Sequence, residues 1–452
     1  MLRFILRHKV LCVVGLLLAF CVYFAASKWN TWFHNPSEVA YTAPDRPAWI
    51  LLTLGNDGEL SRNVSWMCGE EVRNSVVELT DTVRGDTMRI AAQGELFESR
   101  SGKAVHYHAK LNGLHPACHY AYRVVTDGKA SEWYDFTTYP SQRDRFSFLY
   151  VGDVQDSIGG QSNQMLREAL RRNSESEFLL CGGDLTERPA YQYWEETFRD
   201  LDSIAQHMPM MNVTGNHDYL KNVICTLERR FPLIFSYFLD SKVDDNMVYT
   251  TTYANTQFFF LDSNREFLYL PAQRTWLEEQ LKASTAKWKI LVIHHPLYSI
   301  RGNNLIQKWF FNGLVQEYGV DLVLQGHEHA YARRTMKADS GEMTTPVYTV
   351  SHCSPKNYQI EFDDDFDKYG ISSRYYQTID IKGDTMALAT YDAYTCSLYD
   401  SLEIIKKNTT IVVDHGKDIP ENMTYKVNPK SRKSRKYQQR IDAYVKRHPE
   451  RM

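Results

Sequence analysis

The chain has 452 residues, which is long enough for two or three domains and a large hydrophobic core. Its formal net charge of −3 says nothing about partners by itself, but the charge is unevenly distributed. Residues 426–452 hold ten Lys or Arg and two acidic residues, a net charge of +8, which leaves −11 on the rest of the chain. No base-reading motif accompanies the basic segment, and this argues against nucleic-acid recognition.

The N-terminus has the pattern of a leader segment. Arg3, Arg7 and Lys9 precede an uncharged run of 17 residues, Val10–Ala26. This pattern predicts a signal peptide or a membrane anchor within residues 1–28, although 17 residues lie at the short limit for crossing a bilayer. A buried core helix is the alternative. Because positive charge precedes the apolar run, we expect an extracytoplasmic protein, either membrane-anchored or secreted.

Residues 45–140 contain short alternating strand patterns with turn residues every 8 to 12 positions, which predicts a small β-sandwich. The loop 111–116, followed by the strand pattern 120–124, resembles part of a fibronectin type III module. Asp, His and Cys residues are not concentrated in this region, so we expect the domain to have a structural role. Trp66 and Trp133 are predicted to lie in the core of the sandwich.

From residue 143 to about 410 the pattern is that of an α/β domain. Five apolar runs of strand length each end in a polar or glycine-containing turn, and helical patterns lie between them. In such domains the ligand site lies beyond the carboxyl ends of the strands. Asp, Asn and His side chains gathered there suit two metal ions such as Mn, Fe or Zn. The five runs are Phe146–Gln155, Phe178–Asp184, Met208–Asp218, Ile290–Pro296 and Val320–His329.

The polar ends of these runs resemble, in order, the five motif blocks of the calcineurin-like metallophosphoesterase superfamily. The sandwich before them is similar to the arrangement in purple acid phosphatases, and the resemblance covers roughly residues 45–410. It implies a layered β-sandwich flanked by helices, preceded by a small all-β fibronectin III-like domain. The matching blocks are Asp153, Gly183-Asp184, Gly215-Asn216-His217-Asp218, His294-His295-Pro296 and Gly326-His327-Glu328-His329.

The same resemblance implies a role for each block. Asp184 would bridge two metal ions, and His217 would be the general acid that protonates the leaving oxygen. The reaction implied is hydrolysis of phosphate esters by in-line attack of a metal-bound hydroxide. Monoesters, diesters, nucleotides and pyrophosphates all remain open as substrates. The other implied ligands are Asp153 and His329 for the first metal, and Asn216, His294 and His327 for the second.

Two positions depart from the pattern. Gln155 stands where many members of the superfamily have histidine, and we assign it as a weaker amide ligand. Glu187 stands where purple acid phosphatases have the tyrosine that colours them, so we expect a colourless protein. Glu187 could reach the first metal or be a solvated residue at a helix start. Because of both departures, an alternative to the hydrolase stays open. The protein could be a surface binding or interaction protein with a vestigial metal site.

Two softer features complete the predictions. The loop 299–304 contains Arg301 and follows His295, and both residues could face the substrate. Arginine is a side chain that suits phosphate. Second, the basic segment 427–452 has low hydrophobicity and is expected to form a solvated helix or a disordered tail. Such a tail could be attracted to anionic lipid or polymer.

Overall fold

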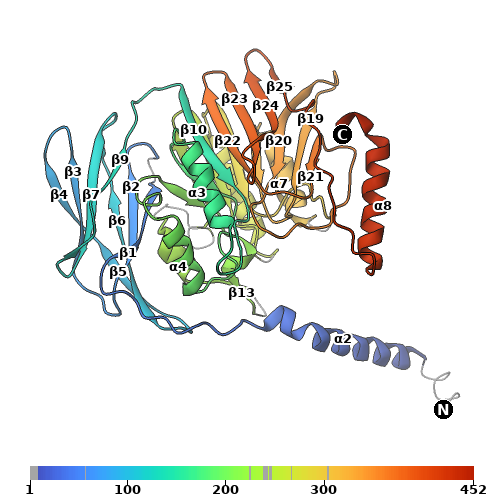
Figure 1. Ribbon diagram of the computed structural model, residues 1–452, viewed down its shortest axis with the longest axis horizontal. Helices are drawn as coiled ribbons and strands as arrows, with labels where there is room; N and C mark the ends of the chain where they lie inside the picture. The colour runs from blue at the N-terminus through green and yellow to red at the C-terminus, as the bar shows by residue number, and fades with distance from the viewer. Residues whose placement is uncertain are drawn as a thin grey trace.

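The computed structural model describes residues 9–55, 58–222, 225–237, 243, 247–265, 267–302 and 305–452; for residues 9–12 and 30–32 it describes only the backbone. Figure 1 shows a small β domain at one end of the molecule, a larger layered domain beside it, and helix α8 at the far side. Residues 303–304 of the loop after the fourth motif block lie outside the described part of the chain.

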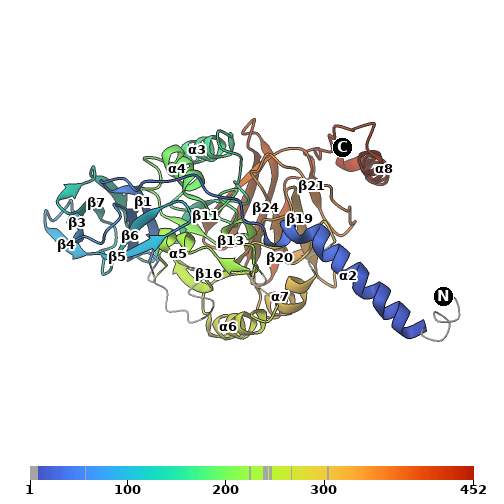
Figure 2. The ribbon, with the colours of Figure 1, turned by 90° about the horizontal axis from the view of Figure 1, so that it is seen from below.

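Helix α2, Lys9–Phe33, extends away from the body of the protein (Figures 1 and 2). Residues 1–8 of the predicted leader lie outside the described residues. Among the residues that are described, no helix combines the length and the apolar character needed to cross a membrane. The signal peptide or membrane anchor expected within residues 1–28 stays a prediction.

The N-terminal domain is an all-β sandwich of two antiparallel sheets. Alternate residues of its strands face the core, as in β3 (Ser75–Asp81), where every second side chain is buried. Trp66 is buried and stacks on Tyr107, with ring centroids 5.5 Å apart, as predicted. Trp133 was wrongly predicted to be core, because its ring is exposed and lies under the guanidinium of Arg123. The first sheet has the order β1 (Ala48–Leu54), β2 (Arg62–Met67), β6 (Lys103–Leu111) and β5 (Gln93–Glu98). The second has the order β4 (Thr87–Ala91), β3 (Ser75–Asp81), β7 (His119–Thr126) and β8 (Lys129–Ala130), and β9 (Tyr134–Thr137) also pairs with β7.

The larger domain contains two seven-stranded sheets that pack face to face. The first has the order β12 (Met210–Asn212), β11 (Leu179–Cys181), β10 (Arg145–Val151), β22 (Tyr375–Lys382), β23 (Thr385–Asp392), β24 (Leu398–Lys406) and β25 (Thr410–Asp414). The second has the order β15 (Tyr249–Tyr253), β16 (Thr256–Leu261), β17 (Trp288–Ile293), β18 (Leu322–Gln325), β20 (Met343–Val350), β19 (Tyr331–Lys337) and β21 (Lys368–Gly370). Strands β10–β12 run parallel to one another, as do β16, β17, β18 and β20.

Helices cover the outer faces of both sheets. On β16, Phe258 points into the core between the sheets, whereas its neighbour Phe259 packs outward with Leu277 of α6 and Phe311 of α7. Figure 2 shows α3 and α4 on one side of the domain and α6 and α7 on the opposite side. The predicted fold class, α/β layers preceded by an all-β domain, is confirmed. The helices are α3 (Ser162–Arg172), α4 (Tyr191–Asp200), α6 (Leu270–Ala283) and α7 (Ile306–Glu317); smaller elements are η1 (Asn216–Asp218), β13 (Tyr219–Leu220), β14 (Thr226–Leu227) and α5 (Arg230–Phe235).

The basic C-terminal segment forms helix α8, Arg432–Arg447, and the short helix η3, Pro449–Arg451. Of the two alternatives for this segment, the structure has a helix, but one that is only partly solvated. Tyr437, Ile441 and Tyr444 are buried against the edge of the second sheet, and Tyr444 stacks on Phe362 at 4.6 Å. Their spacing of four and three residues puts them on one helix face, so the charged residues occupy the other.

Candidate metal centre

The topology brings the five motif blocks to one edge of the layered domain. Strands β10, β11 and β12 are parallel neighbours in the first sheet, and β17 and β18 are parallel neighbours in the second. Each of these strands ends within about four residues of a motif side chain. Because parallel strands present their carboxyl ends at the same edge, side chains from five separate segments meet there.

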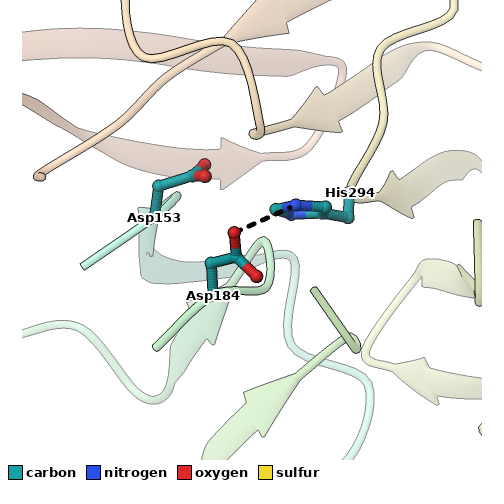
Figure 3. Close-up of side chains that lie close together, drawn as sticks. All are labelled: Asp153, Asp184 and His294. Atoms are coloured by element: carbon teal, nitrogen blue, oxygen red, sulfur yellow. Dashed lines mark ion pairs between the residues drawn. The ribbon is translucent and has the colours of Figure 1, made fainter. Parts of the chain in front are cut away.

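Asp153, Asp184 and His294 form the centre of this cluster (Figure 3). Their ligand-type atoms lie within 4.8 Å of one another, and all three side chains are buried. Nε2 of His294 is 3.4 Å from Oδ2 of Asp184. Two carboxylates and an imidazole at this spacing form a set that can hold a divalent cation.

His329 and Gln155 extend the cluster on the Asp153 side. Nε2 of His329 lies 3.3 Å from Oδ1 of Asp153 and 3.0 Å from Nε2 of Gln155. A 180° rotation of the Gln155 amide exchanges its nitrogen and oxygen and turns the oxygen toward the same point. These three side chains form one potential metal pocket.

Asn216 and His327 extend the cluster on the other side. Oδ1 of Asn216 lies 2.8 Å from Nδ1 of His327 and 3.3 Å from Nε2 of His294. The two sides are connected through the backbone nitrogen of His327, which donates to Oδ2 of Asp153 at 2.6 Å. The structure therefore brings all seven sequence-predicted ligand residues into one cluster, with Asp184 between its two sides.

His217 borders the cluster. Its backbone nitrogen donates to Oδ1 of Asp184 at 2.8 Å, and its Nδ1 lies 2.6 Å from the carbonyl oxygen of Glu187. A hydrogen bond from Nδ1 to that carbonyl leaves Nε2 as the nitrogen available for proton transfer. His217 and Asn216 line a cavity of about 320 Å³.

Backbone carbonyls orient the imidazoles. Nδ1 of His294 lies 2.8 Å from the carbonyl oxygen of Gly182, and Nδ1 of His329 lies 2.9 Å from that of Lys356. These contacts direct Nε2 of both rings toward the cluster, as in metal sites. The acidic residues of the motif blocks, Asp218 and Glu328, have backbone partners of their own. Asp218 accepts from the backbone nitrogen of Gly215, and Glu328 accepts from that of Ile300.

The turns that carry the ligands have an unusual backbone. Asp153, Asp184 and His327 have φ angles of 45°, 53° and 68°, in the left-handed region that non-glycine residues rarely adopt. A Cβ atom at Gly215 would lie 2.0 Å from Oδ1 of Asp184, so only glycine allows this turn to approach the carboxylate. Such strain at several neighbouring residues is typical of functional sites.

The electrostatics couple Asp184 to His294. Burial would raise the pKa of Asp184, but the charges of His294 and His217 hold it well below its usual range. Burial would likewise lower the pKa of His294, but Asp184 and Asp153 raise it to about 9. Without a cation, the two groups therefore form a buried carboxylate–imidazolium pair. A cation bound at Nε2 of His294 would replace that proton.

Two buried oxygen atoms support the fit of a metal ion. Oδ1 of Asp153 and Oε1 of Gln155 accept no hydrogen bond from the residues that the structure describes, although both side chains are almost fully buried. An unpaired buried oxygen costs free energy, and a cation would remove that cost. The oxygen and nitrogen donors therefore fit the two hard or borderline cations expected from the sequence.

The residues around the cluster include some that the sequence did not single out. The carboxylate oxygens of Glu187 lie 2.6 and 2.9 Å from Nζ of Lys356, which pairs this side chain with a cation. The ring of Tyr358 stacks on His329, with centroids 4.2 Å apart. His295, expected to face substrate, is half-buried, with its Nδ1 3.0 Å from Oγ of Ser263 and its ring centroid 4.1 Å from that of His327. Lys356 and Tyr358 lie in an irregular segment with no motif around them, so no local signal marked them.

Comparison with known proteins agrees with this geometry. Residues 146–331 match the calcineurin-like phosphoesterase family, and residues 47–138 match the purple acid phosphatase N-terminal domain. The chain combines a calcineurin-like metallophosphoesterase domain with a purple acid phosphatase N-terminal domain. The recognition made from the sequence motifs is confirmed, and the matches support the expected enzyme class, the metal-dependent phosphoric ester hydrolases.

Individual relatives are distant. An uncharacterized protein of Mycobacterium tuberculosis is 25% identical over 330 residues, which cover 63% of this chain and 61% of that protein. The probable purple acid phosphatase 20 of Arabidopsis thaliana is 25% identical over 348 residues, covering 71% of this chain and 76% of the relative. Among solved structures, the purple acid phosphatase PPD1 from yellow lupin (Lupinus luteus) has a TM-score of 0.69 at 16% identity, covering 80% of this chain and 75% of that one. At that identity the structural likeness concerns the fold alone.

Proposed function

We propose that the protein is a phosphoesterase with two metal ions that hydrolyses phosphate esters outside the cytoplasm. The observation that carries the proposal is the position of Asp184 between two groups of ligand-type side chains, 3.4 Å from His294 and hydrogen-bonded by the backbone of His217. A carboxylate in that position can bridge two cations. The domain limits inferred from the sequence, 45–140 and 143–410, belong to this proposal, with the second domain performing the reaction.

Two groups of residues would hold the metal ions. Asp153, Gln155 and His329 would hold the first, and Asn216, His294 and His327 would hold the second, with Asp184 shared. When bound, such a pair of cations acts as a Lewis acid that lowers the pKa of a water molecule and stabilises charge on phosphoryl oxygens. Mn, Fe and Zn are the proposed metals; a relative from Arabidopsis thaliana, 22% identical over 316 residues, is named an Fe(3+)-Zn(2+) purple acid phosphatase.

His217 is the proposed general acid of an in-line displacement. Its Nδ1 is engaged by the carbonyl oxygen of Glu187, and its ring borders an open cavity, so Nε2 can deliver a proton to the leaving oxygen. Glu187 is bonded to Lys356 in the position where purple acid phosphatases have tyrosine. We therefore expect the iron-loaded protein to lack the visible colour of that family.

The extracytoplasmic location is proposed from the sequence alone. Basic residues precede the uncharged run Val10–Ala26, and this order directs the following chain across a membrane. Detection of the full-length protein in the extracytoplasmic fraction of its host supports the location. Recovery from the cytoplasmic fraction alone would contradict it.

The decisive experiment measures phosphate release and metal content together. The full-length protein, loaded with Mn or Zn, is expected to hydrolyse p-nitrophenyl phosphate and to contain two metal ions by elemental analysis. His217→Ala should retain both ions while losing roughly 10²- to 10⁴-fold in kcat, the usual contribution of a general acid. Equal and negligible turnover by both proteins, on monoesters and diesters alike, would falsify the proposal.

The alternative, a surface interaction protein with a vestigial metal site, makes a different prediction. It was motivated by Gln155 and Glu187. Under this alternative we expect the protein to bind less than one metal ion per chain at saturating Mn or Zn. We also expect its binding function to disappear when residues 35–140 are deleted. Two bound ions together with turnover exclude it.

A further inference from the structure

A large cavity lies between helix α8 and the segment 357–361, at the side of the molecule where α8 packs (Figure 1). Its volume is about 790 Å³, within the usual range for ligand pockets of about 300–1,000 Å³. The charged side chains that line it are five cations and one acid: Arg301, Arg432, Lys433, Lys436, Arg440 and Glu361.

The positive charge in this cavity is largely unpaired. Arg440 is 2.7 Å from Glu361, the acidic residue of the lining. Within the described part of the chain, no ion pair or hydrogen bond is recorded for the side chains of Arg432, Lys433 and Lys436. Arg432 and Lys433 also lie in the first turn of α8, where the helix dipole disfavours positive charge and no acidic residue compensates. A bound anion would relieve both the mutual repulsion and the unfavourable dipole interaction.

The cavity shares a wall with the metal centre. Tyr358 lines the cavity, and on its other side its ring stacks on His329 at 4.2 Å, while its backbone nitrogen donates to the carbonyl oxygen of His329 at 3.1 Å. The guanidinium of Arg301 lies 4.5 Å from the centre of the Tyr358 ring. The backbone nitrogen of Arg301 is 3.3 Å from Glu328, the residue between His327 and His329. The cavity therefore lies next to the metal centre, with Tyr358 and Arg301 between them.

We propose that this cavity binds a second phosphate group of the substrate, so that the enzyme prefers phosphate esters carrying two or more phosphates over those carrying one. This inference rests on the proposed function and specifies its substrate class. Lysine and arginine are the side chains that bind phosphate oxygens through charge-assisted hydrogen bonds. We assign the anion to the substrate, and not to a separate polymer or lipid surface, because only the Tyr358 ring lies between this cavity and His329 of the metal centre.

The first test compares two substrates that differ by one phosphate. The full-length enzyme is assayed with fructose 1,6-bisphosphate and with fructose 6-phosphate at fixed ionic strength. In Lys433→Ala/Lys436→Ala, the ratio of kcat/KM for the bisphosphate to that for the monophosphate should fall about tenfold, mainly through KM, since each exposed ion pair contributes up to about 1 kcal/mol. Arg435→Ala/Lys446→Ala removes the same charge from α8 outside the cavity and should leave the ratio unchanged. An unchanged ratio in the first variant, or an equal fall in both, overturns the inference.

The second test measures binding without turnover. Fructose 1,6-bisphosphate is titrated calorimetrically into the full-length Asp184→Asn protein with and without the two lysine substitutions. The substitutions should weaken binding about tenfold, and 0.5 M salt should reduce the difference because it screens exposed charges. If the lysines affect binding but the wild-type protein hydrolyses neither sugar phosphate nor p-nitrophenyl phosphate, the proposed function fails and the anion site stands. If hydrolysis occurs and the lysines have no effect on binding, the anion site fails and the phosphoesterase stands.

Discussion

Two buried histidines show how the sandwich and the metal-centre edge of the layered domain differ. His106 of β6 and His294 after β17 are both almost fully buried. Burial, together with the charge of Arg230, lowers the pKa of His106 to about 3, so it is a neutral aromatic ring that lies beside Trp49 and Tyr191. Burial acts on His294 in the same direction, but Asp184 and Asp153 reverse it and raise its pKa to about 9.

The comparison teaches that burial alone does not identify a functional histidine. What separates the two regions is the arrangement of carboxylates around the buried ring. In the sandwich, the charge that acts on the buried His106 is that of a cation, Arg230. At the edge of the layered domain, the charges that act on His294 are those of two carboxylates, Asp184 and Asp153, and together with the imidazole they form a set that can hold a cation.

The largest expected effect is at Asp184. In Asp184→Asn, activity on p-nitrophenyl phosphate should fall on the order of 10³-fold or more, because the proposed pair of cations, which would supply several kcal/mol, depends on this carboxylate. Elemental analysis should show loss of at least one ion. Asp127→Asn is the matched control, since Asp127 also has a positive φ, 49°, but lies in a hairpin turn of the sandwich. A comparable loss in the control would mean that left-handed aspartates support the fold in both regions.

Trp66 tests the opposite region. Trp66→Ala should reduce the free energy of unfolding by about 3–5 kcal/mol, because a buried ring that stacks on Tyr107 is lost. The kcat of the protein that remains folded should not change. Trp133→Ala removes a ring that is 46% exposed and should cost less than about 1 kcal/mol in urea unfolding. If Trp66→Ala abolishes kcat in folded protein, the sandwich is more than a support.

A pair of glycines separates backbone conformation from close approach. Gly215→Ala places Cβ 2.0 Å from Oδ1 of Asp184, and displacement of that carboxylate should reduce metal affinity or activity by roughly 10- to 100-fold. Gly113, in the sandwich, has a φ of 67° and open space around its Cβ position. Gly113→Ala should therefore cost about 1–2 kcal/mol of stability with no change in metal binding. Equal metal affinity in both variants would show that the turn at Gly215 can move without consequence.

Much of the site can be predicted from the sequence, because each strand and the polar residue that follows it are adjacent in the chain. An apolar strand followed at once by Gly, Asp, Asn or His marks both the strand and its ligand. The seven proposed ligand residues stand after such strands and were assigned through the family resemblance, and the structure brings them together. The fold class was predictable for the same reason, since strand and helix periodicities alternate along the chain.

Other features depend on contacts between distant segments, which leave no local mark. The carbonyl oxygen of Lys356 orients His329 from 27 residues away, and any residue type could supply a carbonyl there. Glu187 looked like a possible ligand until the position of Lys356 was known, 169 residues further along. The tail was expected to be solvated because its composition is polar, yet the three apolar residues of one face are enough to hold α8 on the sheet.

The smallest expected effect concerns His106, the buried histidine of the sandwich. The folded-state pKa of His106, about 3, lies below the ordinary value of 6.5, so the unfolded chain binds a proton more readily than the folded one. The stability that follows is fully present above pH 6.5 and is lost progressively as the pH falls toward 3. Between pH 7.5 and 5.5 the loss should be about 1 kcal/mol in urea unfolding, and His106→Phe, which keeps an aromatic ring beside Tyr191, should not show it. A wild-type and variant protein with the same pH dependence would mean that water or a rearranged partner reaches His106, and the contrast between a neutral sandwich histidine and a charged one at the metal centre would disappear.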